Sequence, residues 1–177
     1  MFGLQVRYLS FFFGLISILS FFNIIYSYYL NLYLNLNTYY YTLILSLITS
    51  LVFYKIRIPN NKISIFDKIL TVLLGYLIIP IILSIPFYFS IYNLTFLNSY
   101  FESISGFTST GFTIFDNIKH IDQSLILWRS STQWLGGLYF LFSIILLIDI
   151  YDENFKKTLT NFISFDSSEI FKQAIKI

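Results

Sequence analysis

The sequence contains no cysteine and a single histidine among its 177 residues. Disulfide bonds and thiolate metal sites are therefore excluded, and one histidine cannot form a histidine metal cluster within one chain. Charge is scarce as well, because charged residues make up 11% of the chain, against about 25% in an ordinary soluble domain. The small net charge of +2 gives no sign of a nucleic-acid-binding surface.

Apolar residues dominate the composition instead. The chain is 56% hydrophobic and 21% aromatic, with a mean hydropathy of +0.72. This composition is typical of a protein whose solvent is the lipid bilayer, and it predicts an all-α membrane protein.

The first third of the chain is long enough to cross a bilayer twice. No residue from Tyr8 to Tyr54 is charged, and this run is more than twice the length that one crossing requires. Three asparagines interrupt it within Asn31–Thr38, where we expect a turn. We therefore predict an N-terminal transmembrane hairpin over residues 1–54, with spans at Tyr8–Leu30 and Thr38–Tyr54. The alternative for the first span is a signal peptide, but its apolar length exceeds that of a usual signal peptide and no small-residue cleavage site follows.

A basic loop over residues 55–68 sets the orientation. It carries four basic residues against one acid, Asp67, and the basic ones are Lys55, Arg57, Lys62 and Lys68. The positive-inside rule places this loop in the cytoplasm, and the N-terminus is then cytoplasmic too, in agreement with Arg7. A third span follows at Ile69–Tyr92 and contains Pro80 and Pro86, which we interpret as packing kinks rather than a gating hinge.

The next segment, Asn93–Ser105, is apolar but too short to cross the membrane. We predict a re-entrant helix, from which the glycine and hydroxyl residues of Phe101–Thr113 carry the chain back out. Ile114–Ile126 is expected to be an outer loop, and the fourth span to start just after Arg129 and end near Ile148. Residues 69–150 would then form one M1-P-M2 unit, that is, a span, a re-entrant pore segment and a second span, followed by a cytoplasmic amphipathic tail over 151–177.

The residues after the short helix suit a site for a dehydrated monovalent cation. Backbone carbonyls can replace the hydration shell of such an ion. Gly111 can adopt the positive φ that turns successive carbonyls toward one axis, while hydroxyl side chains hold the backbone. The structural alternative is a helix cap at Gly106 followed by an ordinary turn.

Two motifs in this region closely resemble the first pore repeat of the TrkH/KtrB potassium transporters. They are Phe101–Gly111, which reads FESISGFTSTG, and Leu127–Gly137, which reads LWRSSTQWLGG. The two preceding spans look like the extra N-terminal hairpin of the TrkH branch, so the resemblance covers residues 1–150.

The resemblance implies potassium uptake through a filter built from four M1-P-M2 repeats. One repeat would contribute Thr108, Ser109, Thr110, Gly111 and Phe112, with Glu102, Gly106 and Arg129 as filter support. It also implies K⁺ as the transported ion, with Na⁺ or H⁺ as coupling ion, and residence in the cell (inner) membrane with both termini cytoplasmic. The implied partners are the bilayer, the remaining pore repeats or other subunits, and a cytoplasmic nucleotide-binding regulatory subunit. Thr113 stands where strict potassium channels have a second glycine, which would loosen selectivity.

The chain supplies only one of four filter walls. It is therefore expected to be the N-terminal part of a longer or split transporter, with a homotetramer as a weaker option. The competing functions are a non-conducting fragment or accessory membrane subunit and, less favoured, a membrane enzyme. No histidine pair, cysteine or intramembrane carboxylate pair is present for acid–base or metal chemistry, so we do not expect an enzyme.

Several polar residues have both a structural and a functional interpretation. For Glu102 the functional interpretation is an ionisable group that contacts the ion at membrane depth, and the favoured structural one is that it braces the filter through hydrogen bonds or pairs with Arg129. Arg129 with Trp128 forms either an interfacial anchor or part of the outer mouth. Other features are given structural or solvated roles: helix packing for Gly136 and Gly137, solvent exposure for His120, and a solvated charged turn for Asp149, Asp152 and Glu153.

Overall fold

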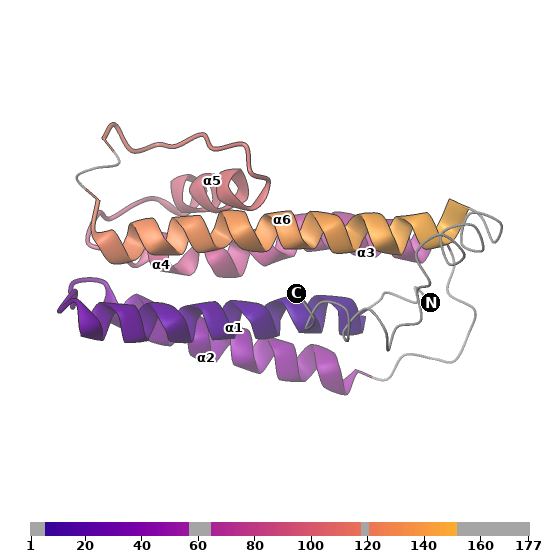
Figure 1. Cartoon of the computed structure of the whole chain (residues 1–177), viewed down its shortest axis with the longest axis horizontal. Coiled ribbons are helices and arrows are strands. Elements are labelled where there is room, and N and C mark those ends of the chain that lie inside the picture. Colours follow the sequence, from indigo (N-terminus) through magenta and orange to yellow (C-terminus); the bar gives the residue numbers. More distant parts are fainter. Residues whose placement is uncertain (1–5, 57–64, 118–120, 152–177) are drawn as a thin grey trace, which may run out of the picture. The chain divides into compact units, whose positions relative to one another are not determined.

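The computed structural model describes residues 6–56, 65–117 and 121–151, and every regular element in these ranges is a helix (Figure 1). The helices are α1 (Val6–Tyr29), α2 (Leu36–Lys55), α3 (Ile65–Leu83), α4 (Ile85–Tyr88), α5 (Phe96–Phe107) and α6 (Gln123–Tyr151). The chain divides into two compact units, residues 1–141 and 142–177. Of the second unit, the described part is the last stretch of α6. The predicted amphipathic tail over 151–177 lies outside the described residues, apart from Tyr151.

Four helical segments are long and apolar enough to cross a membrane, which agrees with the four predicted spans. They are Arg7–Tyr29, Leu36–Lys55, Phe66–Tyr88 and Gln123–Leu147. The fourth begins earlier than predicted, because Trp128 and Arg129 lie inside α6 instead of just ahead of it. The chain is thus an all-α, multi-pass membrane protein.

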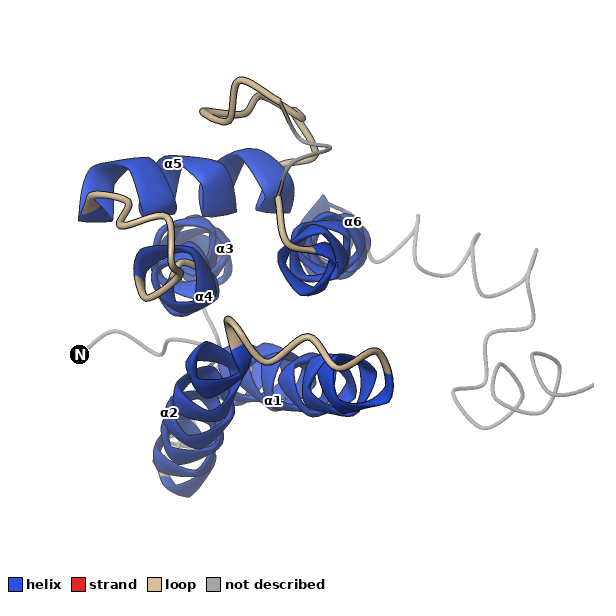
Figure 2. Ribbon diagram, turned by 90° about the vertical axis from the view of Figure 1, so that its left-hand side faces the viewer, coloured by secondary structure: helices blue, strands red, loops and turns tan. Residues whose placement is uncertain are grey.

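The first two helices pack side by side as a hairpin (Figures 1 and 2). Hydroxyl groups fasten them at one end, where Ser10 Oγ donates to the Ser50 carbonyl at 2.8 Å and Ser50 Oγ donates to the Ser10 carbonyl at 2.9 Å. Nearer the turn, Ser20 Oγ donates to the Tyr39 carbonyl at 2.7 Å. The turn falls where the asparagines predicted it, and Asn31 adopts a left-handed φ of +56°, a conformation that asparagine tolerates.

The third predicted span is broken near its end. Pro86 has no N–H, and α3 ends at Leu83 before the short α4 begins at Ile85. The indole Nε1 of Trp128, on α6, donates to the Leu83 carbonyl at 3.1 Å. Trp128 is fully buried. The interfacial-anchor interpretation of Trp128 was therefore wrong, because its indole satisfies a carbonyl at a helix break instead of facing a headgroup layer.

The short α5 is oriented differently from the long helices. Figure 2 looks along the long helices and shows α5 lengthwise, so α5 crosses them. Figure 1 shows it beside the first half of α6, with the following loop returning to the end at which α6 begins. An aromatic cluster holds its C-terminal end, because buried Phe107 lies 5.6 Å from the Tyr76 ring and 5.2 Å from the Tyr139 ring, between ring centroids.

Candidate functional site

The candidate site begins with the N-terminus of α5. Thr95 caps this helix, its Oγ1 accepting from the Asn98 N–H at 3.3 Å. The helix therefore runs over Phe96–Phe107, about three residues later than the predicted Asn93–Ser105. At 12 residues it spans about 18 Å, which is too short to cross a bilayer core of about 30 Å.

The C-terminus of α5 is a Schellman turn. The Ser109 N–H donates to the Gly106 carbonyl at 2.9 Å, and the Thr110 N–H donates to the Ser105 carbonyl at 3.1 Å. Ser109 fills the left-handed position of this motif with φ +57°, where glycine is usual. The alternative prediction placed the helix cap at the wrong residue. Gly106 is helical, and the turn forms two to three residues later.

Gly111 follows with a second positive φ, of +80°, as its glycine predicted. Thr108 to Thr110 thus lie between a helix end and a left-handed glycine, and these residues are exposed. Among the described residues, no hydrogen bond reaches the carbonyl oxygens of Thr108, Ser109 or Thr110. These three carbonyls are available to a ligand.

The carbonyls of Gly111 and Phe112, by contrast, accept hydrogen bonds from side chains. Arg129 Nη2 donates to them at 3.1 and 3.3 Å respectively, and the Phe112 carbonyl also accepts from Ser105 Oγ at 2.6 Å. The guanidinium of Arg129 is therefore directed at the turn after α5 from the neighbouring helix α6. Its side chain is only 13% exposed.

Glu102 is the acidic partner of Arg129 at this turn, and its side chain is fully buried. Arg129 Nε lies 2.6 Å from its Oε1. The Thr113 hydroxyl donates to the carboxylate at 3.0 and 3.1 Å, and the Ile114 N–H donates at 3.1 Å. In the structure Glu102 pairs with Arg129 and also hydrogen-bonds the segment that follows the turn.

Two glycines bring α5 and α6 into contact. A Cβ on Gly106 would collide with the Thr132 side chain, and a Cβ on Gly136 would collide with the Phe107 backbone. A Cβ on Gly137 would meet nothing within 4 Å. The predicted packing role therefore applies to Gly136, while the space beside Gly137 is open among the described residues.

The structure adds one residue that sequence reasoning did not single out, Ser105. It accepts backbone N–H groups through its carbonyl and holds the Phe112 carbonyl through its hydroxyl. Thr113 is one of the hydroxyl residues expected to hold the backbone, and its hydroxyl bonds the Glu102 carboxylate. Ser105 lies in α5 and Phe112 beyond its end, so the period of a single element offers no signal for the Ser105 contact.

A second polar cluster ties the hairpin to both ends of the segment that contains α5. Buried Asn35 accepts from the Ile91 N–H through Oδ1 at 3.1 Å and donates to Asp122 Oδ2 through Nδ2 at 2.8 Å. Ser124 Oγ also donates to Asp122 Oδ2, at 2.7 Å. Tyr39 OH in turn donates to Ser124 Oγ, at 2.9 Å. One asparagine in the hairpin turn thus fixes the chain before α5 and after it.

Other predicted polar features lie beyond this site. His120, Asp152 and Glu153 are outside the described residues, and Asp149 is described only as part of the α6 backbone. Within the described ranges, no group of three or more His, Cys, Asp or Glu side chains could hold a metal ion.

Comparison with known proteins gives partial matches to transporters. The chain is 38% identical over 65 residues to an uncharacterised cation transporter of Methanocaldococcus jannaschii, covering 37% of this chain and 14% of that protein. It is 40% identical over 60 residues to the Trk system potassium uptake protein TrkI of Halomonas elongata, covering 34% and 11%. It is 29% identical over 92 residues to the Trk system potassium uptake protein TrkH of Escherichia coli, covering 51% and 19%. The matched segments thus span less than a fifth of each of these three relatives. No family model and no solved structure matches the chain.

Proposed function

Because the chain belongs, over the part that matches, to the TrkH/KtrB family of potassium transporters, we propose that it takes part in potassium uptake across a membrane. In this proposal residues 69–150 form one M1-P-M2 repeat, and Thr108 to Phe112 supply one wall of a filter, in which the carbonyls of Thr108, Ser109 and Thr110 are free to contact the ion while those of Gly111 and Phe112 are held by Arg129. The matched relatives are named as transporters, which agrees with the expectation that the chain is not an enzyme.

The observation that carries the proposal is the unusual backbone after α5. A dehydrated K⁺ needs several oxygen ligands that do not bind it too tightly, and neutral carbonyls meet this need. The carbonyls of Thr108, Ser109 and Thr110 accept no hydrogen bond among the described residues. The positive φ angles of Ser109 and Gly111 determine the directions in which these carbonyls point.

The Glu102–Arg129 pair supports the same assignment. An ion site must keep its shape without adding a charge that would trap the cation. Glu102 and Arg129 offset each other, and together they bond Thr113, Ile114 and the carbonyls of Gly111 and Phe112. We therefore assign Glu102 and Arg129 to support of the filter, and Gly106 to the close approach of α5 and α6 that the support requires.

One wall does not make a filter. We propose that the other three come from the remaining repeats of a longer or split TrkH-like transporter, because the matched segments are 11% to 19% of the relatives. The same proposal includes residence in the inner membrane with cytoplasmic termini, coupling to Na⁺ or H⁺, and control by a cytoplasmic nucleotide-binding subunit. A homotetramer of this chain is the less favoured arrangement.

Growth at low potassium tests the transport proposal. The chain would be expressed in a potassium-uptake-deficient cell, alone and together with the sequence that follows it in its genome. We expect growth and Rb⁺ uptake to be restored with the following sequence. If neither arrangement restores uptake while the chain is present in the membrane, the transport proposal fails.

The competing function is a non-conducting fragment or accessory membrane subunit. The two functions differ in the effect of the filter residues. In an accessory subunit, changes at Gly111 would leave the ion selectivity of any partner unchanged, whereas in a filter wall they would alter it.

A further inference from the structure

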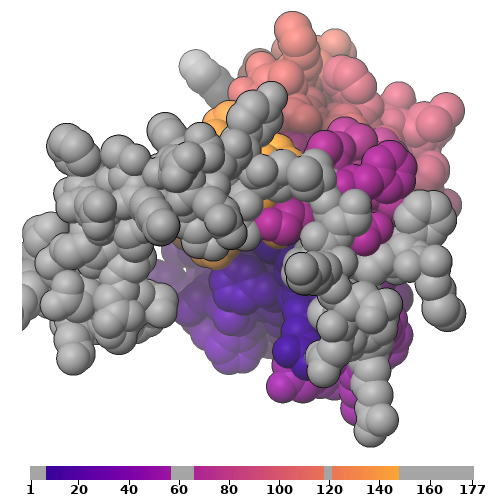
Figure 3. All heavy atoms as spheres, turned by 90° about the vertical axis from the view of Figure 1, so that its right-hand side faces the viewer, coloured from indigo at the N-terminus to yellow at the C-terminus, as the bar shows by residue number. Residues whose placement is uncertain are grey.

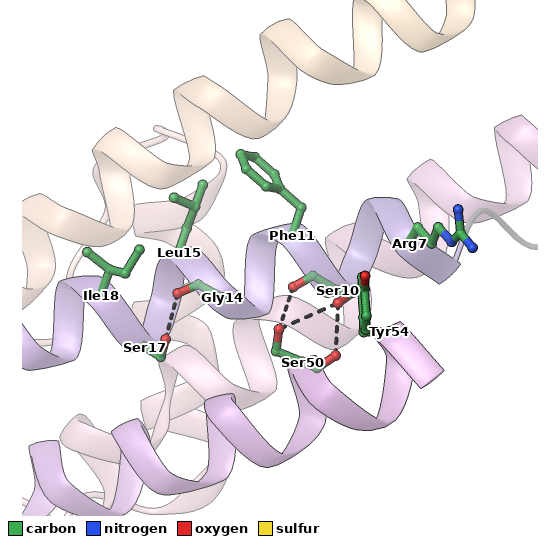
Figure 4. Close-up of a pocket in the computed structure, with 9 residues that line it drawn as sticks. All are labelled: Arg7, Ser10, Phe11, Gly14, Leu15, Ser17, Ile18, Ser50 and Tyr54. Carbon is green, nitrogen blue, oxygen red and sulfur yellow. Dashed lines mark hydrogen bonds between the residues drawn. The ribbon is translucent and has the colours of Figure 1, made fainter. Parts of the chain in front are cut away.

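A groove opens on the hairpin, away from the proposed filter. It has a volume of about 480 Å³ and lies between α1 and the end of α2 (Figure 4). Its lining includes Arg7, Phe11, Gly14, Leu15, Ile18 and Tyr54.

The walls of the groove are apolar and its serine hydroxyl groups are already engaged. Phe11, Leu15 and Ile18 line it from α1 and point away from α2 (Figure 4), and Phe11 and Ile18 are about half exposed. At the floor, Ser10 and Ser50 bond each other's carbonyls. Gly14 keeps the floor low, since it has no side chain. The groove therefore offers hydrocarbon contacts along its length, and its serine hydroxyl groups already have partners.

The length of the groove corresponds to one leaflet. From Arg7 to Ile18 the helix rises about 16 Å, and half of a bilayer core is about 15 Å. A transmembrane helix of another protein would need a groove across both leaflets. An acyl chain needs only one.

The mouth of the groove is positively charged. Arg7 lies at this end of α1, and exposed Lys55 ends α2 next to Tyr54. Figure 3 looks onto this end of the chain and shows the indigo atoms at the start of α1 at the surface. The sequence has no acidic residue before Asp67, and the described basic residues of this end, Arg7 and Lys55, are both exposed. Tyrosine and arginine at a membrane interface suit a lipid headgroup, and the cytoplasmic leaflet carries the anionic lipids.

We propose that this groove binds one anionic phospholipid, with its phosphate at Arg7 and Lys55 and an acyl chain along Phe11, Gly14 and Ile18. The proposal rests on the hairpin and on the cytoplasmic placement of its ends, and it is independent of the proposed transport function.

Lipid binding to the full chain in detergent tests the proposal, with native mass spectrometry as the readout. The probes are phosphatidylglycerol, which is anionic, and phosphatidylcholine, which has the same acyl chains and no net charge. We expect more phosphatidylglycerol than phosphatidylcholine adducts on the unmodified chain. Arg7→Gln should lower phosphatidylglycerol binding about fivefold without changing phosphatidylcholine binding.

Two further variants separate the groove from the general charge of this end. Gly14→Leu should fill the groove and remove the preference, whereas Ile44→Phe, which enlarges an exposed apolar residue of α2 outside the groove, should keep it. If Gly14→Leu fails to fold, Arg7→Gln still tests the proposal, because it changes only a surface side chain. Equal binding of the two lipids, or an unchanged preference in Arg7→Gln or in folded Gly14→Leu, would overturn the proposal.

Discussion

At the scale of single residues, the Glu102–Arg129 pair is the point on which the candidate site depends. The carboxylate is fully buried, and Arg129 reaches it with one nitrogen while another holds the carbonyls of Gly111 and Phe112. A buried ion pair of this kind contributes little net stability as a pair. Removing one partner is costly, however, because the other charge is left buried and uncompensated.

We therefore expect Arg129→Gln to lower the free energy of unfolding by about 3–5 kcal/mol. The double variant Glu102→Gln with Arg129→Gln should recover much of this loss, because no buried charge remains. Thermal unfolding of the purified chain in detergent measures both, with Arg7→Gln as the control for loss of a basic residue elsewhere. A single Arg129→Gln variant as stable as the unmodified chain would contradict the claim that Arg129 compensates the buried carboxylate of Glu102.

At the scale of the elements, the hairpin is joined to the segment containing α5 through Asn35. Its amide bonds the backbone of Ile91 before α5 and the carboxylate of Asp122 after it. The hairpin thus restrains both ends of the segment that carries the candidate filter, although it contributes no residue to that segment.

Asn35→Ala should release both ends together. The change leaves the Ile91 N–H without its acceptor and removes a hydrogen bond to a carboxylate, which is worth about 1.5–3 kcal/mol. We expect faster backbone hydrogen exchange around residues 89–95 and 121–126, measured by mass spectrometry. The matched control is Asn37→Ala, an exposed asparagine two residues away. If Asn35→Ala exchanges no faster than Asn37→Ala in these segments, the hairpin does not restrain them.

The elements also show what the sequence could predict. Length and hydropathy were sufficient for four spans and a short helix between the third and fourth, because each follows from the run of apolar residues. The break at Leu83 and the burial of Trp128 were not predictable in that way, since a proline marks a kink but not the side chain that satisfies the freed carbonyl. Within the site, the positive φ of Gly111 followed from its residue type. The positive φ of Ser109 did not, because only the Schellman geometry selects it.

At the scale of the whole molecule, the proposed filter makes this chain one part of an assembly. Its described residues contain a single segment with a helix too short to span and a turn with unpaired carbonyls. A filter that surrounds an ion on all sides needs further walls from outside this segment. In this proposed assembly, the backbone around Gly111 contributes to ion selection.

The most direct test is ion selectivity after substitution of Gly111. A Cβ at Gly111 would meet nothing within 4 Å, so Gly111→Ala changes mainly the cost of φ +80°, about 1–2 kcal/mol for a residue with a side chain. Gly137→Ala is the matched control, since its Cβ also meets nothing and no positive φ is required. Rb⁺ and Na⁺ uptake would be compared in the potassium-uptake-deficient cell, with the following sequence supplied. We expect Gly111→Ala to lower the preference for Rb⁺ over Na⁺ about tenfold and Gly137→Ala to leave it unchanged. A Gly111→Ala variant with the uptake and selectivity of the unmodified chain would contradict the account.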